Sequence, residues 1–208
     1  MLVTAVLVAA GITTSTAQTV YSVNIVGYIN KSLPSGLSLI ANQLNASPDN
    51  KVQTLFGLPA GPVTVYKFNP STGNFDQAAY DPDAGWSDLT SMVLNPGEGA
   101  FVDNGGDAFT LTLVGEVKLS STVNIHPAID TYSSVIPQSG LISTLGFPTP
   151  PAALTVYKFN GRTFDSFAFD PDAAAWSPSE PSLNIGEGIF IDNAGALLAW
   201  TRTFTVGP

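Results

Sequence analysis

The chain contains no cysteine, which excludes disulfide bonds, cysteine metal sites and thiol nucleophiles. It also has little positive charge, because 7 Lys and Arg residues stand against 16 Asp and Glu residues, for a net charge of −9. Nucleic acids and anionic membranes attract basic proteins, so we expect neither as a partner. Charged residues make up 11% of the chain, against about 25% in ordinary soluble domains. We interpret this as the surface of an extracellular protein.

Long apolar segments are also missing. The longest apolar run, Leu2 to Ile12, is shorter than the roughly 20 residues that a membrane-spanning helix needs. It is followed by small residues, with Ser15 and Ala17 at the positions that a signal peptidase reads. This pattern predicts a signal peptide over residues 1–17, cleaved after Ala17, and an exported protein without a transmembrane anchor. A buried N-terminal strand or helix is the alternative interpretation.

What the chain does contain is an internal repeat. The hexapeptide TVYKFN stands at residues 64–69 and again at residues 155–160. NPGEGAFVDN begins at Asn95, and NIGEGIFIDN begins at Asn184. The motifs keep their order while their spacing changes by a few residues, which is typical of a duplicated segment.

The repeat predicts two tandem domains. We place copy 1 at residues 18–117 and copy 2 at residues 118–208, with SVNI at residues 22–25 and TVNI at residues 122–125 marking their starts. No linker rich in Pro, Gly or Ser separates the copies, so we expect the domains to touch.

Residue alternation predicts β-strands within each copy. In TVYKFN, Thr64, Tyr66 and Phe68 fall on one side of a strand, and we expect this aromatic side to lie in the core. Helical spacing in DNKVQTLFG (residues 49–57) and its partner SGLISTLGF (residues 139–147) predicts one short helix in each copy. The expected fold class is all-β, with two tandem homologous domains of β-sandwich or partly open barrel type.

The order of these motifs resembles a module of secreted bacterial proteins. GLSLIANQL, a short helix, TVYKFN, a Trp after an acidic turn and NPGEGAFV follow one another in the chain. That module opens with a W/F-x-L-I-x-x-P-like strand and closes with a P-G-x-G-F/Y-F/W-V-like strand. The resemblance implies an envelope or extracellular protein with no known active site and no cofactor. The chain departs from the module at Ala100, where a second aromatic residue is usual, and at the opening of copy 2.

Catalytic motifs are scarce. The single histidine, His126, has no counterpart in copy 1, and no GxSxG motif accompanies it, so we predict a surface or turn residue. Glu98 with Asp103, and Glu187 with Asp192, match a glycosidase pair in composition alone, which makes a glycoside hydrolase the least favoured function. We therefore predict that the protein is not an enzyme.

The glutamates of the two GEG turns have a structural alternative. Each can accept hydrogen bonds from turn amides or pair with a cation. Two of the few basic side chains, Lys67 and Lys158, stand at matched positions of the repeat. This predicts the ion pairs Lys67–Glu98 and Lys158–Glu187, each contributing little if exposed.

Two groups of residues are candidates for ligand binding. Four aspartates in the acidic turns are weak calcium candidates, although no carboxylate follows at the twelfth position of a calcium loop and Asx turns are the favoured interpretation; they are Asp81, Asp83, Asp170 and Asp172. Five aromatic residues could form a stacking platform for a glycan, with core packing as the alternative; they are Tyr80, Trp86, Phe167, Phe169 and Trp176.

These observations favour a non-enzymatic secreted or cell-surface protein with a structural or adhesive role, able to assemble into a filament or surface layer. Gln18 to Ile29 is a β-prone segment without charge, so it is a candidate for strand addition to a second copy. Pairing of this segment within its own domain is the alternative. A carbohydrate-binding module with an extracellular glycan as partner is the second function that the sequence supports.

Overall fold

The computed structural model of the chain describes residues 25–87 and 91–205. The predicted signal peptide and residues 18–24 of the candidate strand-addition segment lie outside these ranges. Nearly all regular structure in the described residues is antiparallel β-sheet, which confirms the all-β fold class. Within those ranges no helix has the length and apolarity needed to cross a bilayer.

Copy 1 forms two sheets. Strands β2, β6, β3, β4 and β5 build a five-stranded sheet in that order, and β1 pairs with β7 in a separate two-stranded ladder. The elements of copy 1 are β1 (Val26–Leu33), β2 (Gly36–Ala41), α1 (Val52–Phe56), β3 (Val63–Asn69), β4 (Asn74–Asp81), β5 (Gly85–Trp86), β6 (Gly99–Asn104) and β7 (Phe109–Glu116).

Copy 2 repeats this arrangement. Its five-stranded sheet has the order β13, β12, β11, β15, β9, while β16 pairs with β8, and β10 pairs with β14. The elements of copy 2 are β8 (Ser120–Ile125), β9 (Ala128–Tyr132), β10 (Gly140–Leu141), β11 (Leu154–Phe159), β12 (Phe164–Asp170), β13 (Ala175–Ser177), β14 (Ser182–Leu183), β15 (Ile189–Asn193) and β16 (Leu198–Thr203).

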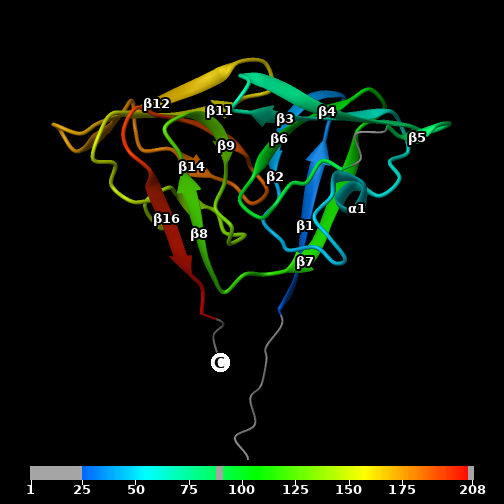
Figure 1. Cartoon of the computed structure of the whole chain (residues 1–208), viewed down its shortest axis with the longest axis horizontal. Helices are drawn as coiled ribbons and strands as arrows, with labels where there is room; N and C mark the ends of the chain where they lie inside the picture. The colour runs from blue at the N-terminus through cyan, green and yellow to red at the C-terminus, as the bar shows by residue number, and fades with distance from the viewer. Residues whose placement is uncertain (1–24, 88–90, 206–208) are drawn as a thin grey trace, which may run out of the picture.

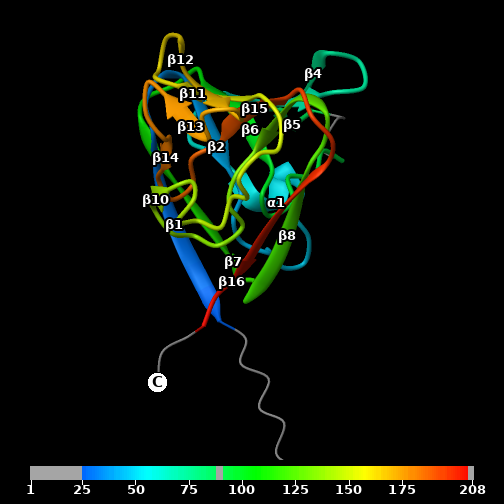
Figure 2. The same ribbon diagram turned by 90° about the vertical axis from the view of Figure 1, so that its left-hand side faces the viewer.

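The two five-stranded sheets form the broad upper layer of the molecule, and the β1–β7 and β8–β16 ladders descend from it (Figure 1). Both ends of the described chain leave at the narrow lower end (Figures 1 and 2). Each copy therefore encloses its core between a five-stranded sheet above and a two-stranded ladder below, in a sandwich-like arrangement.

The side of β3 that faces the core is the opposite of the predicted one. Val63 and Val65 are buried at 2% and 0% exposure, whereas Tyr66 and Phe68 lie on the outer face of the sheet and remain partly exposed. The space below the sheet is filled by aliphatic side chains of other segments, mainly leucines from the β1–β7 ladder and the connecting loops. The small side chains of Val63 and Val65 pack against these aliphatic residues. The prediction that the aromatic side of the strand lies in the core is therefore wrong.

The predicted helix forms in copy 1 as α1 but not in copy 2. There, residues 142–146 make a single turn, in which the Leu145 N–H donates to the Leu141 carbonyl over 3.1 Å. Residues 140–141 belong to strand β10, so the turn cannot extend toward the N-terminus. At its other end, Gly146 has a positive φ of 81°, which is not helical. Three prolines between residues 148 and 151 then prevent continuation, because proline cannot donate a helical hydrogen bond. The expectation of a second helix is corrected accordingly.

Two buried asparagines fix the correspondence between the copies. The Asn104 Nδ2 atom donates to the Leu33 carbonyl over 3.3 Å and to the Asp107 carbonyl over 2.9 Å. Asn193 repeats these bonds with the carbonyls of Ile125 (3.3 Å) and Ala196 (2.8 Å). Leu33 is therefore equivalent to Ile125.

This correspondence changes the alignment at the start of the repeat. Because residue 33 matches residue 125, the TVNI segment at residues 122–125 matches residues 30–33 within β1. The predicted match to SVNI at residues 22–25 is wrong, since four common strand residues can recur by chance. Residues 26–29 of the candidate strand-addition segment pair with β7 in their own copy. Within the described chain, no strand pairs with the other edge of β1.

Candidate functional site

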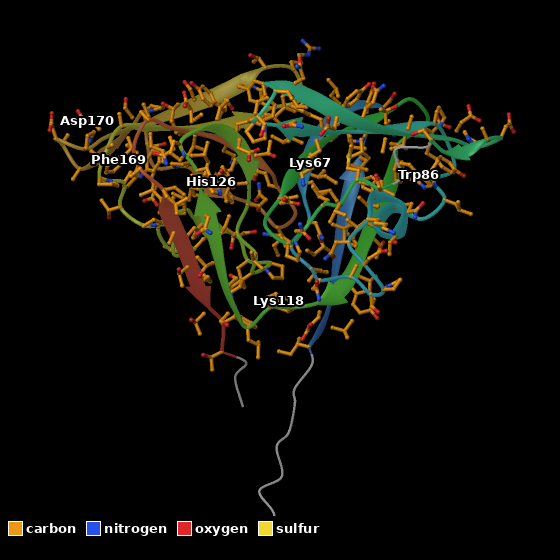
Figure 3. The ribbon with its side chains drawn as sticks, in the orientation of Figure 1. Lys67, Trp86, Lys118, His126, Phe169 and Asp170 are labelled. Carbon is orange, nitrogen blue, oxygen red and sulfur yellow. The ribbon has the colours of Figure 1, made fainter. Side chains whose placement is uncertain are left out.

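The five predicted platform residues do not come together. Tyr80 and Phe169 are buried in the cores of the two copies, at 8% and 5% exposure. Trp86 packs on Tyr80 with ring centroids 5.3 Å apart, and Trp176 packs on Phe169 at 5.2 Å. Phe167 is partly buried against the core of copy 2. Figure 3 places Trp86 and Phe169 at opposite ends of the molecule, so these residues form two groups rather than one surface.

The acidic turns adopt the Asx conformation. The Asp81 Oδ1 atom accepts the backbone N–H groups of Asp83 (2.8 Å) and Ala84 (3.1 Å). In copy 2, the Asp170 Oδ1 atom accepts the N–H group of Asp172 over 2.9 Å. These carboxylates therefore shape their own turns. Within residues 25–87 and 91–205, no group of three His, Asp or Glu side chains is placed to hold a metal ion.

The two predicted ion pairs are confirmed. Lys67 Nζ lies 2.8 Å from Glu98 Oε2, and Lys158 Nζ lies 3.2 Å from Glu187 Oε1. Each glutamate also accepts a turn amide, from Asn95 over 2.6 Å in copy 1 and from its equivalent over 2.7 Å in copy 2. Each pair thus fastens a GEG turn to the middle strand of its sheet.

This geometry separates the carboxylates that resemble a glycosidase pair. Glu98 pairs with Lys67, which shares the inner side of β3 with Val65. Asp103 alternates with the buried Val102 on β6 and therefore lies on the outer face with Phe101. The two carboxylates lie on opposite sides of the sheet and cannot flank one glycosidic bond.

His126 is exposed, in agreement with the predicted surface or turn position. Its backbone N–H donates to the Tyr132 hydroxyl over 3.0 Å. The local structure therefore uses the main chain of this residue and leaves the imidazole at the surface.

The most prominent surface feature is a cluster of phenylalanines contributed by both copies, which we call the aromatic face. It lies on the outer side of the two five-stranded sheets, and its six members are Phe68, Phe75, Phe101, Phe159, Phe164 and Phe190. The internal repeat relates them in pairs, because Phe68 and Phe159 end equivalent strands and face Phe75 and Phe164 across equivalent hairpins.

The aromatic face joins the copies through ring contacts. Phe101 lies 5.1 Å from Phe159 and 5.9 Å from Phe190, and Phe68 lies 5.8 Å from Phe190, measured between ring centroids. Most of these pairs are edge-to-face, the arrangement that ring quadrupoles favour. The rings therefore hold one another in fixed, inclined orientations.

Part of this cluster is open to solvent. Phe75 is 44% exposed, Phe164 is 41% exposed, and the neighbouring Ile129 is 38% exposed. Together with Phe101, Tyr157 and Phe190 these residues line a shallow hollow of about 400 Å³ with an entirely apolar surface. A contiguous apolar patch of this kind on a folded protein marks an interaction site more often than a neutral surface.

A second hollow continues the aromatic face over copy 1. It has a volume of about 290 Å³ and is lined by Leu37, Tyr66, Phe75, Phe101 and Asp103. A phenol and a carboxylate thus stand beside two aromatic rings. This hollow combines apolar contact area with groups that can form directed hydrogen bonds.

The aromatic face is not among the sites that the sequence predicts, although the sequence carries one signal for it. Phe68 and Phe75 flank a turn of Asn, Pro, Ser, Thr and Gly residues, so a hairpin would pair them directly. Phe159 and Phe164 flank the equivalent turn. The contacts between the two hairpins depend on how the copies pack, which no local pattern reveals.

A comparison of the chain with protein-family models, curated proteins and solved structures gives no match. The resemblance to modules of secreted bacterial proteins therefore stays a prediction.

Proposed function

We propose that the chain is a non-enzymatic adhesive or structural protein of the cell exterior, and that the aromatic face is its contact surface. The observation that carries the proposal is that exposed phenylalanines of both copies interlock in one patch. The low content of charged residues and the acidic net charge suit an exported surface protein.

The energetics favour a contact role for this patch. Fully burying a large apolar side chain stabilises a complex by about 1.5–3 kcal/mol, and partial burial by proportionately less. Phe75 and Phe164 retain much of this free energy because they are more than one-third exposed. Their rings are already held by neighbouring rings, so binding would cost little side-chain entropy.

A non-catalytic role also agrees with the carboxylate geometry. Glu98 and Glu187 are engaged by lysines and turn amides. A general acid needs a carboxyl group that is free to exchange a proton with substrate.

The test compares surface retention of the signal-cleaved protein with that of a Phe75→Gln, Phe164→Gln double variant. Both proteins are passed over a phenyl-functionalised matrix, and adsorption to an apolar sensor surface is measured in parallel. We expect at least a tenfold loss of retention in the double variant. Leu58→Gln is the matched control, because Leu58 is 81% exposed and lies outside the aromatic face. Equal retention of all three proteins, with unchanged melting temperatures, would refute the proposal.

Carbohydrate binding is the second candidate function, supported by the hollow over copy 1. Tyr66 and Asp103 stand beside Phe75 and Phe101, and sugar recognition combines aromatic stacking with hydrogen bonds to hydroxyl groups. The inclined ring orientations provide less parallel stacking area than a flat platform. A polysaccharide array separates the two candidates, because Asp103→Asn should abolish glycan retention while leaving retention on the phenyl matrix unchanged.

Assembly with a second copy is a further part of the proposal. One edge of β1 lacks a strand partner among the described residues, and an unpaired edge can add a strand from another chain. A variant lacking residues 18–24 retains β1 and its core residue Ile29. Light scattering should show oligomers for the signal-cleaved protein and monomers for this variant. Monomers in both cases would exclude assembly through this segment.

A further inference from the structure

A polar cleft of about 460 Å³ lies between the two copies. Copy 1 contributes Lys67 and Glu98 to its lining, and copy 2 contributes His126, Asp130 and Tyr132. Figure 3 places Lys67 and His126 on either side of the boundary between the copies. The cleft is distinct from the aromatic face, although residue 68 lies at the border of both.

The charges in this cleft are not balanced. Lys67 is paired with Glu98, while Asp130 forms no ion pair within the described parts of the chain. The Asp130 Oδ1 atom accepts the backbone N–H of Thr131 over 2.7 Å. Burial raises the pKa of the Asp130 carboxyl above its ordinary value, and nearby Glu98 acts in the same sense. Thr131, Lys67 and His126 oppose this shift.

The internal repeat supplies an equivalent set of residues around Glu187 for comparison. There, the Lys158–Glu187 pair of copy 2 meets Lys31 of β1. Burial lowers the pKa of the Lys31 ammonium, Glu187 opposes this shift, and Lys158 adds to it. The side chain of Lys31 therefore lies beside the GEG turn of copy 2, where the charge of Glu187 acts on it.

Packing against the turn glycines shows which residues correspond. A methyl group on Gly186 would lie 3.2 Å from Ile29 Cγ2 and 3.7 Å from Lys31 Cδ. A methyl group on the equivalent Gly97 would lie 2.8 Å from Val123 Cγ2. The ladder registers agree, because the offset of 125 − 33 = 92 places Val123 at the position of Lys31.

The two sets of residues therefore differ at two equivalent positions. Val123 stands where the other set has Lys31, so this position has a shorter side chain and no ammonium group. Asp130 replaces Ser38 at the same offset of 92, which adds a carboxylate. The set around Glu187 therefore has two ammonium groups and one carboxylate, whereas the cleft of about 460 Å³ is lined by one ammonium group, two carboxylates and the imidazole of His126.

We infer that the cleft lined by Asp130 binds a small ligand through a primary ammonium group, which takes the place that the Lys31 ammonium occupies in the other half. Asp130 is the counter-ion, and Val123 leaves the space that the alkyl part of the ligand fills. This inference does not depend on the proposed adhesive function.

The probe is n-butylammonium, which has the structure of a lysine side chain. Titration at pH 7, followed by NMR shifts of residues lining the cleft, should give a dissociation constant on the order of 1 mM, as suits so small a ligand. In the Asp130→Asn variant, which keeps an acceptor for the Thr131 N–H, the dissociation constant should rise at least tenfold. The neutral isostere 1-butanol should bind at least tenfold more weakly to the wild-type protein. Equal affinity of the variant, or of butanol, would overturn the inference.

A second variant tests the same idea from the opposite direction. Val123→Lys supplies the ammonium from the chain itself, so it should abolish butylammonium binding and raise the melting temperature when Asp130 is present. Ser38→Asp introduces a carboxylate at the position equivalent to Asp130 in the set around Glu187. It should leave butylammonium binding unchanged. Unchanged NMR shifts of residues distant from the cleft check that Asp130→Asn is folded. Undiminished binding of butylammonium to Val123→Lys would also overturn the inference.

Discussion

At the scale of single residues, Asp130 should influence the pH dependence of folding. Burial raises its pKa in the folded protein above the ordinary value of 3.8, so the folded state binds the proton more tightly than the unfolded state does. The resulting stabilisation is fully present below pH 3.8 and is lost as the pH rises through the folded-state pKa.

This sign gives the first prediction. Asp130→Asn, which removes the charge but keeps an acceptor for the Thr131 amide, should increase the free energy of unfolding at pH 7. At pH 3 the Asp130 carboxyl of the wild type is largely protonated in both the folded and the unfolded protein. The difference in free energy of unfolding between the variant and the wild type should therefore nearly vanish. Urea denaturation at the two pH values measures the effect. A variant less stable than the wild type at pH 7 would show that attraction between Asp130 and Lys67 outweighs the cost of burial.

The second prediction concerns the paired asparagines. Asn104 and Asn193 are 1% and 2% exposed, and their side chains satisfy buried carbonyl groups. Replacing either with Ala should reduce the free energy of unfolding by about 1–3 kcal/mol for each group left unsatisfied. Asn74→Ala on the exposed hairpin is the control and should have little effect. Very different losses for the two buried asparagines would contradict their structural equivalence.

At the scale of elements, sequence patterns predicted the strands better than their orientation. The alternation in TVYKFN identifies a strand, but both sides of that strand are largely apolar or amphipathic. The side of the strand that is buried depends on how much space remains below the sheet. There, Leu33, Leu111 and Leu113 already occupy much of the core. Hence Val65 is buried and Tyr66 faces outward.

The candidate site was harder to predict than the strands for a related reason. Trp86 and Trp176 follow acidic turns, and this local pattern made them candidates for a stacking platform. In the structure each instead packs beside the core of its own copy. The aromatic face arises from two hairpins distant in sequence, joined by contacts such as Phe101 with Phe159. The ion pairs could be predicted because both partners recur at matched positions within each copy.

The third prediction addresses the GEG turns. Glu98→Gln keeps an acceptor for the Asn95 amide but removes the charge, so it should cost no more than about 1 kcal/mol, the usual upper value for a partly exposed pair. Glu98→Ala also leaves the turn amide without its acceptor and should cost about 1 kcal/mol more. The free energies of unfolding of the wild type and Glu98→Gln are compared in about 0.05 M and about 1 M salt. The higher salt concentration screens the ion pair, so it should reduce the difference in stability between the two proteins. A salt-independent difference would show that charge contributes little.

At the scale of the whole molecule, the copies are joined by polar contacts beneath the aromatic face. Gln43 is 1% exposed; its Nε2 atom donates to the Ser134 carbonyl over 2.7 Å, and its Oε1 atom accepts the Gly186 N–H over 2.8 Å. The Ser133 N–H donates to the Gly97 carbonyl over 2.8 Å. Each copy therefore inserts its GEG turn against the other.

The fourth prediction is that the two copies unfold as one unit. Gln43→Ala should reduce the free energy of unfolding by about 2–4 kcal/mol, because it leaves two buried backbone groups without partners. Trp86 reports on copy 1, whereas Trp176 and Trp200 report on copy 2. Fluorescence of Trp86→Phe, compared with calorimetry of the same variant, should give one common transition. Two transitions would mean that the contacts between copies are too weak to couple their folding.

The arrangement of the chain ends gives the molecule a polarity. Both ends of the described chain leave beneath the ladders (Figure 1). The aromatic face lies on the opposite, outer side of the five-stranded sheets. A molecule immobilised through either of these ends would thus turn the aromatic face, with its exposed Phe75 and Phe164, toward the surroundings. Duplication places two five-stranded sheets in the layer farthest from these ends, so the aromatic face extends over both copies.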